Sequence, residues 1–218
     1  VDGFRFDLSK GFTQAGDTDG RYDDSRVGYL KEYNYHIKCV NPNAVMICEH
    51  FVDDENYALG QDGIKVWRNM NHPYSKAMKR DMSQSDFTGV TNGFNSNGMM
   101  ADWNHFGSLV GYMESHDEQR INYEGQWSYD GSSIPFATRM ERAKANAAFF
   151  LLVPGPKMIW QFGEIGYDIS IDDNGRTGKK PCKTTEYMNV AERKALYDTY
   201  SKLIAFRKKN HILFDYDV

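Results

Sequence analysis

The sequence predicts an α/β fold, and three observations support that prediction. Short apolar segments alternate along the 218 residues with segments of helical periodicity. Most apolar segments are continuous runs, which is typical of parallel strands covered by helices. The loops richest in acidic and aromatic residues all follow strand-like segments, as they do at the active-site face of a (β/α) barrel. We therefore expect a barrel-type parallel sheet.

The expected elements follow one another without an internal repeat or a low-complexity linker. The segment 85–98 is rich in turn-forming residues and is expected to be a loop, as is the Gly- and Asp-rich stretch that ends near residue 184. Strands are expected at 2–7, 44–50, 63–69, 108–115 and 156–162, and helices at about 26–38, 74–82, 139–153 and 190–210.

The composition is ordinary for a globular protein, with 40% hydrophobic and 26% charged residues. A net charge of −4 without a long Lys/Arg run argues against nucleic acid as a partner. No run of about 18 apolar residues occurs, so no membrane span is expected. The three cysteines show none of the short Cys/His spacings of a zinc site, and no metal site is expected.

Three of the expected strands end in a carboxylate. Asp7 follows "GFRF", Glu49 follows "AVMIC" and Asp117 follows "GYMESH". A single acid at such a position is commonly a helix cap or a solvated strand end. Three together favour another interpretation, because a partly desolvated acid needs a cationic neighbour or a chemical task.

Two carboxyl groups that face one pocket can cleave a glycosidic bond, one as the nucleophile and the other as the proton donor. Arg5 shares a strand face with Asp7 and would keep it ionised, which suits a nucleophile. Glu49 follows an apolar run without an adjacent cation and would hold a proton more readily, which suits the general acid. Asp117, beside His116, would bind sugar hydroxyls and stabilise positive charge at the anomeric carbon.

The same segments resemble a known family. "GFRFDLSKG", "ICEHF" and "ESHDEQR" resemble the nucleophile, general-acid and His-Asp segments on barrel strands four, five and seven of the α-amylase family of glycoside hydrolases. "PGPKMIWQFGEIGYD" is similar to that family's eighth strand with its following loop, and "LIAFRKKNHIL" to its eighth helix. The order and spacing match over nearly the whole chain.

The resemblance implies a role for each matching residue. Asp7 would be the nucleophile, Glu49 the acid/base and Asp117 the third carboxylate. Gly11 stands where the family often has His, which removes that side chain from the acceptor-side contact and from any calcium site at this position. The substrate-binding residues implied are Arg5 as the partner of Asp7, His116 as a sugar-binding side chain, and Lys10, which matches the motif's lysine.

Other residues keep two interpretations. His50 either lines the edge of the cleft and binds substrate or is a packed histidine at a strand end. Arg176, in "DDNGRTGKKP", either reaches substrate or is a solvated loop arginine. The four tryptophans divide by position: core packing is expected for Trp67 and Trp160, and sugar stacking for Trp103 and Trp127.

A closed barrel needs eight strands and about 250 residues. We expect residues 1–218 to be the C-terminal portion of a glycoside hydrolase catalytic barrel, roughly strands four to eight of a (β/α)8 TIM barrel, with strands one to three and an inserted lobe absent. Two open sheet edges predict self-association. A subsite without one wall predicts that the chain alone is inactive.

The expected function is that of a retaining α-glucan hydrolase that acts on starch or maltooligosaccharides by double displacement. The alternatives are a transglycosylase or branching-type enzyme, which uses the same covalent intermediate, and a non-catalytic barrel used for binding. No cofactor is evident, and the resemblance leaves calcium open for the full-length protein. Localisation is undecided, although a secreted or periplasmic location would suit an enzyme of polymeric starch.

Overall fold

The computed structural model describes residues 1–13, 20–87 and 109–214 of the chain. Trp103 and most of the loop expected at 85–98 lie outside these ranges. Among the described residues, no helix combines the length and apolar character that crossing a membrane requires.

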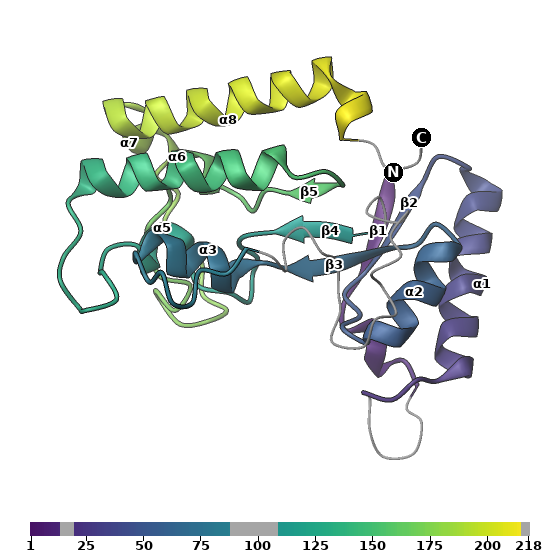
Figure 1. Ribbon diagram of the computed structural model, residues 1–218. Coiled ribbons are helices and arrows are strands. Elements are labelled where there is room, and N and C mark those ends of the chain that lie inside the picture. The colour runs from purple at the N-terminus through teal and green to yellow at the C-terminus, as the bar shows by residue number, and fades with distance from the viewer. Residues whose placement is uncertain (14–19, 88–108, 215–218) are drawn as a thin grey trace.

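A five-stranded parallel sheet forms the centre of the structure. Its order is β1-β2-β3-β4-β5, so the order in space follows the order along the chain. The sheet curls into a half-barrel between α1 and α2 at one end and α6 and α8 at the other (Figure 1). This confirms the predicted α/β class and the partial barrel. The strands are β1 (Gly3–Phe6), β2 (Val45–Cys48), β3 (Lys65–Asn69), β4 (Leu109–Tyr112) and β5 (Lys157–Met158).

The long helices lie near their expected positions, whereas several short elements were not predicted. Strand β5 is only two residues long where 156–162 was expected. Helix α2 was missed because its nine residues are mostly polar and show no helical apolar pattern. The helices are α1 (Asp24–Val40), α2 (Asp53–Gln61), α3 (Asn71–Met78), α5 (Ile121–Glu124), α6 (Phe136–Leu152), α7 (Thr184–Met188) and α8 (Ala191–Lys209), with 3-10 turns η1 (Ser9–Gly11), η3 (Gly163–Ile165) and η4 (His211–Leu213).

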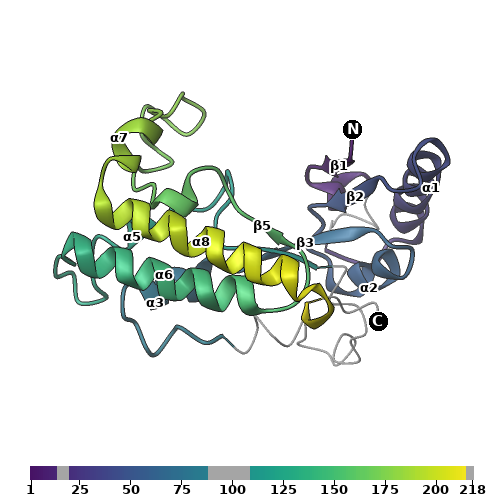
Figure 2. The same cartoon turned by 90° about the horizontal axis from the view of Figure 1, so that it is seen from above.

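Side chains on the outer face of the sheet pack against the helices in two separate clusters. Figure 2 shows the helices of these clusters at opposite ends of the sheet. The first cluster joins the strands to α1 and α2 and contains Val27, Leu30, Met46, Cys48, Leu59, Ile64, Val66 and Leu109. The second lies among α3, α5, α6 and α8 and contains Met70, Tyr74, Met78, Met113, Ile121, Met140, Ala143, Ala147, Phe150, Leu151, Leu196 and Tyr200.

The inner face of the sheet carries a smaller apolar cluster. Trp67 of β3 packs against Val110 and Tyr112 of β4, and the rings of Trp67 and Tyr112 are 4.8 Å apart at their centroids. Because side chains alternate along a strand, these residues face away from the helices. The packed rings of Trp67 and Tyr112 therefore line the inner face next to the strand ends.

Candidate active site

The predicted acidic residues lie together at the carboxyl ends of the strands. Strands β1 and β2 are parallel, and their register pairs Phe6 with Cys48. The next residue along each strand is a carboxylate, so Asp7 and Glu49 stand side by side. Asp117 follows β4, which pairs with β3 in the same sheet. Because the strands are parallel, three carboxylates that are far apart in the sequence lie at the same edge of the sheet.

Arg5 lies between the two adjacent carboxylates. Its Nη1 donates to Asp7 Oδ1, and its Nη2 donates to Glu49 Oε2 at 2.6 Å. The guanidinium also lies 4.1 Å from the centre of the Trp67 ring, a cation–π contact. The expectation that Glu49 lacks an adjacent cation is wrong. Its neighbour is supplied by the strand pairing, in which Arg5 stands opposite Ile47.

Asp7 is held in its ionised form. Its side chain is 70% exposed. A hydrogen bond with Glu49 and then the hydrogen bond and charge of Arg5 lower the pKa of Asp7 below its ordinary value, and the charge of His116 acts in the same direction. An ionised, accessible carboxylate is the form that a nucleophile needs.

Glu49 is shifted in the opposite direction. Glu49 is only 7% exposed. Burial raises the pKa of Glu49, and Asp7 adds to this effect, although the Leu8 N–H at 3.0 Å and the charge of Arg5 oppose it. Adjacent carboxyl groups whose pKa values are pushed apart are the arrangement that assigns one as base or nucleophile and the other as acid. Of the two carboxyl groups, Glu49 therefore holds a proton more readily than Asp7.

The residues after β4 complete the edge. His116 Nε2 lies 3.4 Å from Asp117 Oδ2, and the His116 ring stands between Trp67 and Trp160, with both centroid distances at 6.1 Å. Arg176 Nη2 donates to the Asp117 carbonyl at 2.7 Å and lies 3.3 Å from Asp117 Oδ1. The loop arginine singled out from the sequence thus meets the third carboxylate.

One further predicted residue, His50, lies differently from what was expected, and the sugar contact of Lys10 stays a prediction. His50 is fully buried, with Nδ1 2.9 Å from Ser9 Oγ and Nε2 2.6 Å from Glu55 Oε2. The expected position of His50 at the cleft edge is wrong, because protein groups occupy both ring nitrogens. Lys10 lies in η1 with its side chain partly exposed, and its carbonyl accepts a hydrogen bond from Arg26 Nη1 at 2.6 Å.

Sequence reasoning missed residues that stand among the carboxylates. Tyr112 is buried, and burial together with the charges of Glu118, Glu49 and Asp117 raises its pKa. Asn69, the last residue of β3, donates to Glu118 Oε1 at 2.5 Å. Asn69 and Glu118 lie next to residues that the sequence had singled out, because Asn69 ends the expected strand 63–69 and Glu118 follows Asp117. Their position at strand ends was the signal that could have identified them.

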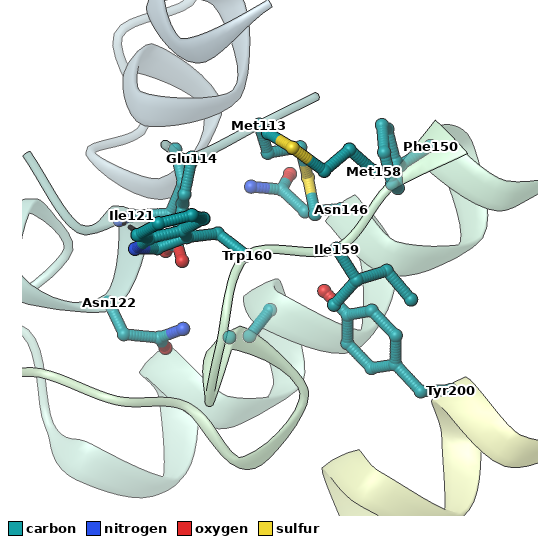
Figure 3. Close-up of a pocket in the computed structure, with 12 residues that line it drawn as sticks. Met113, Glu114, Ile121, Asn122, Asn146, Phe150, Met158, Ile159, Trp160 and Tyr200 are labelled. Atoms are coloured by element: carbon teal, nitrogen blue, oxygen red, sulfur yellow. Dashed lines mark hydrogen bonds between the residues drawn. The ribbon is translucent and has the colours of Figure 1, made fainter. Parts of the chain in front are cut away.

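A cavity of about 20 Å³ lies deeper in the structure, on the side of the second core cluster. Glu114, Asn122 and Tyr200 contribute polar groups to its wall, and Trp160 lies at its margin (Figure 3). Its volume suits about one water molecule and is far too small for a sugar ring. The edge of the sheet that carries Asp7 and Asp117 is instead accessible to a sugar, because their side chains are 70% and 52% exposed.

Among the residues that the structure describes, no group of three or more His, Cys, Asp and Glu side chains is placed to hold a metal ion. Calcium in a longer protein stays a prediction. Trp127 packs its ring edge-on against Tyr123 and is 42% exposed, so its stacking role is likewise a prediction.

Comparison with known proteins finds structural likeness without a sequence match. No family model matches the sequence, and no curated protein matches it significantly. An apo pullulanase from Klebsiella pneumoniae superposes with a TM-score of 0.64 at 15% identity, over 95% of this chain and 31% of that one. A maltotriose complex of the K. pneumoniae protein PulA gives 0.62 at 16% identity, over 96% and 31%.

An apo pullulanase from Paenibacillus barengoltzii gives a TM-score of 0.61 at 19% identity, over 95% of this chain and 33% of that one. The chain thus spans about a third of the length of the structures that it matches. Likeness at this level of identity establishes the fold alone. This chain therefore has the fold of part of the barrel found in α-amylase-family glycoside hydrolases such as the pullulanases.

Proposed function

We propose that the chain is the part of a retaining α-glucan hydrolase that carries the nucleophile and the general acid. The observation that carries this proposal is the pair of adjacent carboxyl groups bridged by Arg5, with the pKa of Asp7 lowered and that of Glu49 raised. Paired carboxyl groups of opposite protonation state are the requirement for double displacement at a glycosidic bond.

In the proposed reaction, Asp7 attacks the anomeric carbon while Glu49 transfers its proton to the leaving glycosidic oxygen. The bond that forms is an ester between Asp7 and the sugar, and the bond that breaks is the glycosidic C–O bond. Glu49, now ionised, then removes a proton from water, which attacks the anomeric carbon and releases Asp7. Arg5 remains hydrogen-bonded to both carboxyl groups and so keeps them in position.

The third carboxylate has a binding role in this proposal. Asp117 is half exposed and carries His116 and Arg176 beside it, so the group can accept hydrogen bonds from sugar hydroxyls without losing its own partners. The substrate class is supported by the fold shared with pullulanases, one of which was solved with maltotriose. The choice of an α-glucan follows from that likeness and from the sequence resemblance.

The proposal assigns this activity to a longer protein with a complete barrel. The chain spans 31% of the K. pneumoniae apo pullulanase, and the described sheet has five strands of the eight in a closed barrel. A reacting subsite that lacks part of its wall loses the positioning from which much of the rate enhancement arises. We therefore expect the isolated chain to be inactive.

The test is an assay of a longer protein that contains this chain, with starch and maltooligosaccharides as substrates. Glu49→Gln is expected to lower kcat by about 10²–10⁴-fold, the usual contribution of a general acid. Asp7→Asn is expected to abolish the glycosyl-enzyme and to cost at least as much. Glu141→Gln is the control, because Glu141 is an exposed carboxylate paired only with Lys144 among the described ion pairs.

The stereochemistry of the first product, measured by NMR, tests retention. A product with inverted anomeric configuration would contradict Asp7 as a nucleophile. Glucan binding without turnover in the wild type would favour the non-catalytic alternative, and oligosaccharides longer than the substrate would favour transglycosylation. Full activity in both Asp7→Asn and Glu49→Gln would refute the assignment.

A further inference from the structure

We infer that Ser9, His50 and Glu55 form a buried relay of positioning residues that holds the Glu49 carboxyl in place, an inference that rests on the proposed function. The three side chains are fully buried, at 0% exposed. Substrate therefore cannot reach them, and any effect on the reaction has to pass through Glu49 and the turn beside it.

The relay begins at the backbone of the general acid. The Glu49 carbonyl accepts from Ser9 N at 2.9 Å and from Ser9 Oγ at 3.1 Å. Ser9 Oγ lies 2.9 Å from His50 Nδ1, and His50 Nε2 lies 2.6 Å from Glu55 Oε2. The hydrogen bonds thus run without a gap from the end of β2 to helix α2.

Glu55 fixes the far end of the relay. Arg26 donates Nε to Glu55 Oε2 at 2.9 Å and Nη2 to Oε1 at 2.6 Å, and the Asp23 N–H donates to Oε1 at 2.7 Å. Burial alone would raise the pKa of Glu55, but the hydrogen bonds from His50, Arg26 and Asp23 lower it below its ordinary value. Glu55 is consequently an ionised acceptor, which places a proton on His50 Nε2.

This assignment explains how the ring holds the serine. When Nε2 alone is protonated, Nδ1 accepts from the Ser9 hydroxyl, and the Ser9 N–H holds the Glu49 carbonyl. When both ring nitrogens are protonated, Nδ1 donates to Ser9 Oγ, whose own proton then turns to the Glu49 carbonyl. In either state, His50 determines the orientation of the Ser9 side chain.

The backbone is strained just after β1 and just after β2, and the relay is placed to hold these strained turns. Leu8 has φ 41° and Phe51 has φ 54°, in the left-handed region that non-glycine residues rarely occupy. Such conformations persist where surrounding contacts hold them. Leu8 directs its N–H to Glu49 Oε2 at 3.0 Å, so relaxation of this turn would move a hydrogen bond away from the general acid.

The test uses a longer protein containing this chain and two aryl α-glucosides, one with a leaving group that needs protonation and one with an acidic phenol that does not. General-acid catalysis matters chiefly for the first substrate. Ser9→Ala and His50→Gln are expected to lower kcat for it by about tenfold, a fraction of the 10²–10⁴-fold available from a general acid, with KM nearly unchanged. The loss with the activated substrate should be at most twofold.

Asn34→Ala is the matched control. It removes the hydrogen bond that the buried side chain of Asn34 in α1 donates from Nδ2 to the Asp62 carbonyl at 2.8 Å, and should lower stability without a leaving-group dependence. Glu49→Gln calibrates the assay and should show the largest difference between the substrates. If Glu49→Gln shows that difference and both relay variants behave like Asn34→Ala, the relay is overturned while the proposed function stands.

If Glu49→Gln shows no such difference, both the relay and the role of Glu49 fall. Ser9→Ala decides the question if His50→Gln fails to fold, because it deletes one oxygen atom and leaves the Ser9 N–H in place.

Discussion

At the scale of single residues, Arg5 connects three strands through one side chain. It meets Asp7 after β1, Glu49 after β2 and the ring of Trp67 in β3. With the proton on Glu49, Arg5 and Asp7 balance and the group is neutral; without it, the group carries one negative charge next to buried aromatic rings. Low polarity favours the neutral state, in agreement with the raised pKa of Glu49.

A second residue-scale feature is Asp23, which caps helix α1. Its titration makes the stability of this helix, next to the site, sensitive to acid. Asp23 accepts from Ser25 Oγ at 2.5 Å and from Thr13 Oγ1 at 2.8 Å, and these hydrogen bonds lower its pKa from 3.8 to about 2. Because the folded-state pKa is depressed, the stabilisation is fully present above pH 3.8 and is lost as the pH falls through about 2.

We therefore expect Asp23→Asn to weaken the dependence of the unfolding free energy on pH between about 4 and 2. Urea denaturation at several pH values in this window measures the slope. Asp24→Asn, one residue further along, is the control, because Asp24 lies within the helix and Asp23 is the cap. An equal slope in wild type and Asp23→Asn would contradict the role of this carboxylate.

At the scale of elements, hydrophobic pattern predicted the five strands and the helices α1, α3, α6 and α8, because burial repeats along one segment. It missed α2, α5 and α7, which have nine, four and five residues and are too short to show a clear apolar periodicity. It also singled out the three carboxylates, because Asp7 and Glu49 directly follow apolar runs and Asp117 follows the expected strand at 108–115. The cation beside Glu49 was missed because it depends on the register of β1 against β2, a contact across 44 residues that local pattern does not contain.

The pairing of β1 with β2 depends on a glycine. A Cβ atom on Gly3 would lie 2.2 Å from the Val45 carbonyl oxygen, so any larger residue forces the strands apart. We expect Gly3→Ala to destabilise the protein by about 1–3 kcal/mol, as overpacking does. Because the same pairing aligns Asp7 with Glu49, the variant should also lose activity in the longer protein.

Gly28→Ala is the control for this change. Gly28 lies on the exposed side of α1 with no atom within 4 Å of an added Cβ, and alanine there should stabilise the helix by about 0.5–1 kcal/mol. Chemical denaturation compares both variants with the wild type. A Gly3→Ala protein as stable as the wild type would show that β1 shifts to accommodate the methyl group.

At the scale of the whole molecule, the described sheet has two edges, β1 and β5. Among the described residues, no strand pairs with the outer side of β1, and Phe4 on this strand is 49% exposed. Edges of this kind invite pairing with another strand. In a complete barrel, the strand that precedes β1 would cover this edge.

We expect the isolated chain to self-associate in a concentration-dependent manner, measurable by sedimentation velocity. Phe4→Lys should shift the distribution toward the monomer, because a lysine at an edge strand opposes pairing. Tyr35→Lys is the control, since Tyr35 is 66% exposed and belongs to helix α1, whose backbone is not part of the sheet. A monomer at every concentration would contradict this prediction.

The order of the strands has a consequence for synthesis on the ribosome. Because neighbours in the sheet are also neighbours along the chain, each parallel pair can close once its second strand has emerged. Arg5, Asp7, Glu49 and the relay to Glu55 all lie within the first 55 residues, whereas Asp117 and Arg176 follow much later. Asp7 and Glu49 can therefore meet before the segment that carries Asp117 and Arg176 has been made, and those two residues are added to a pair already formed.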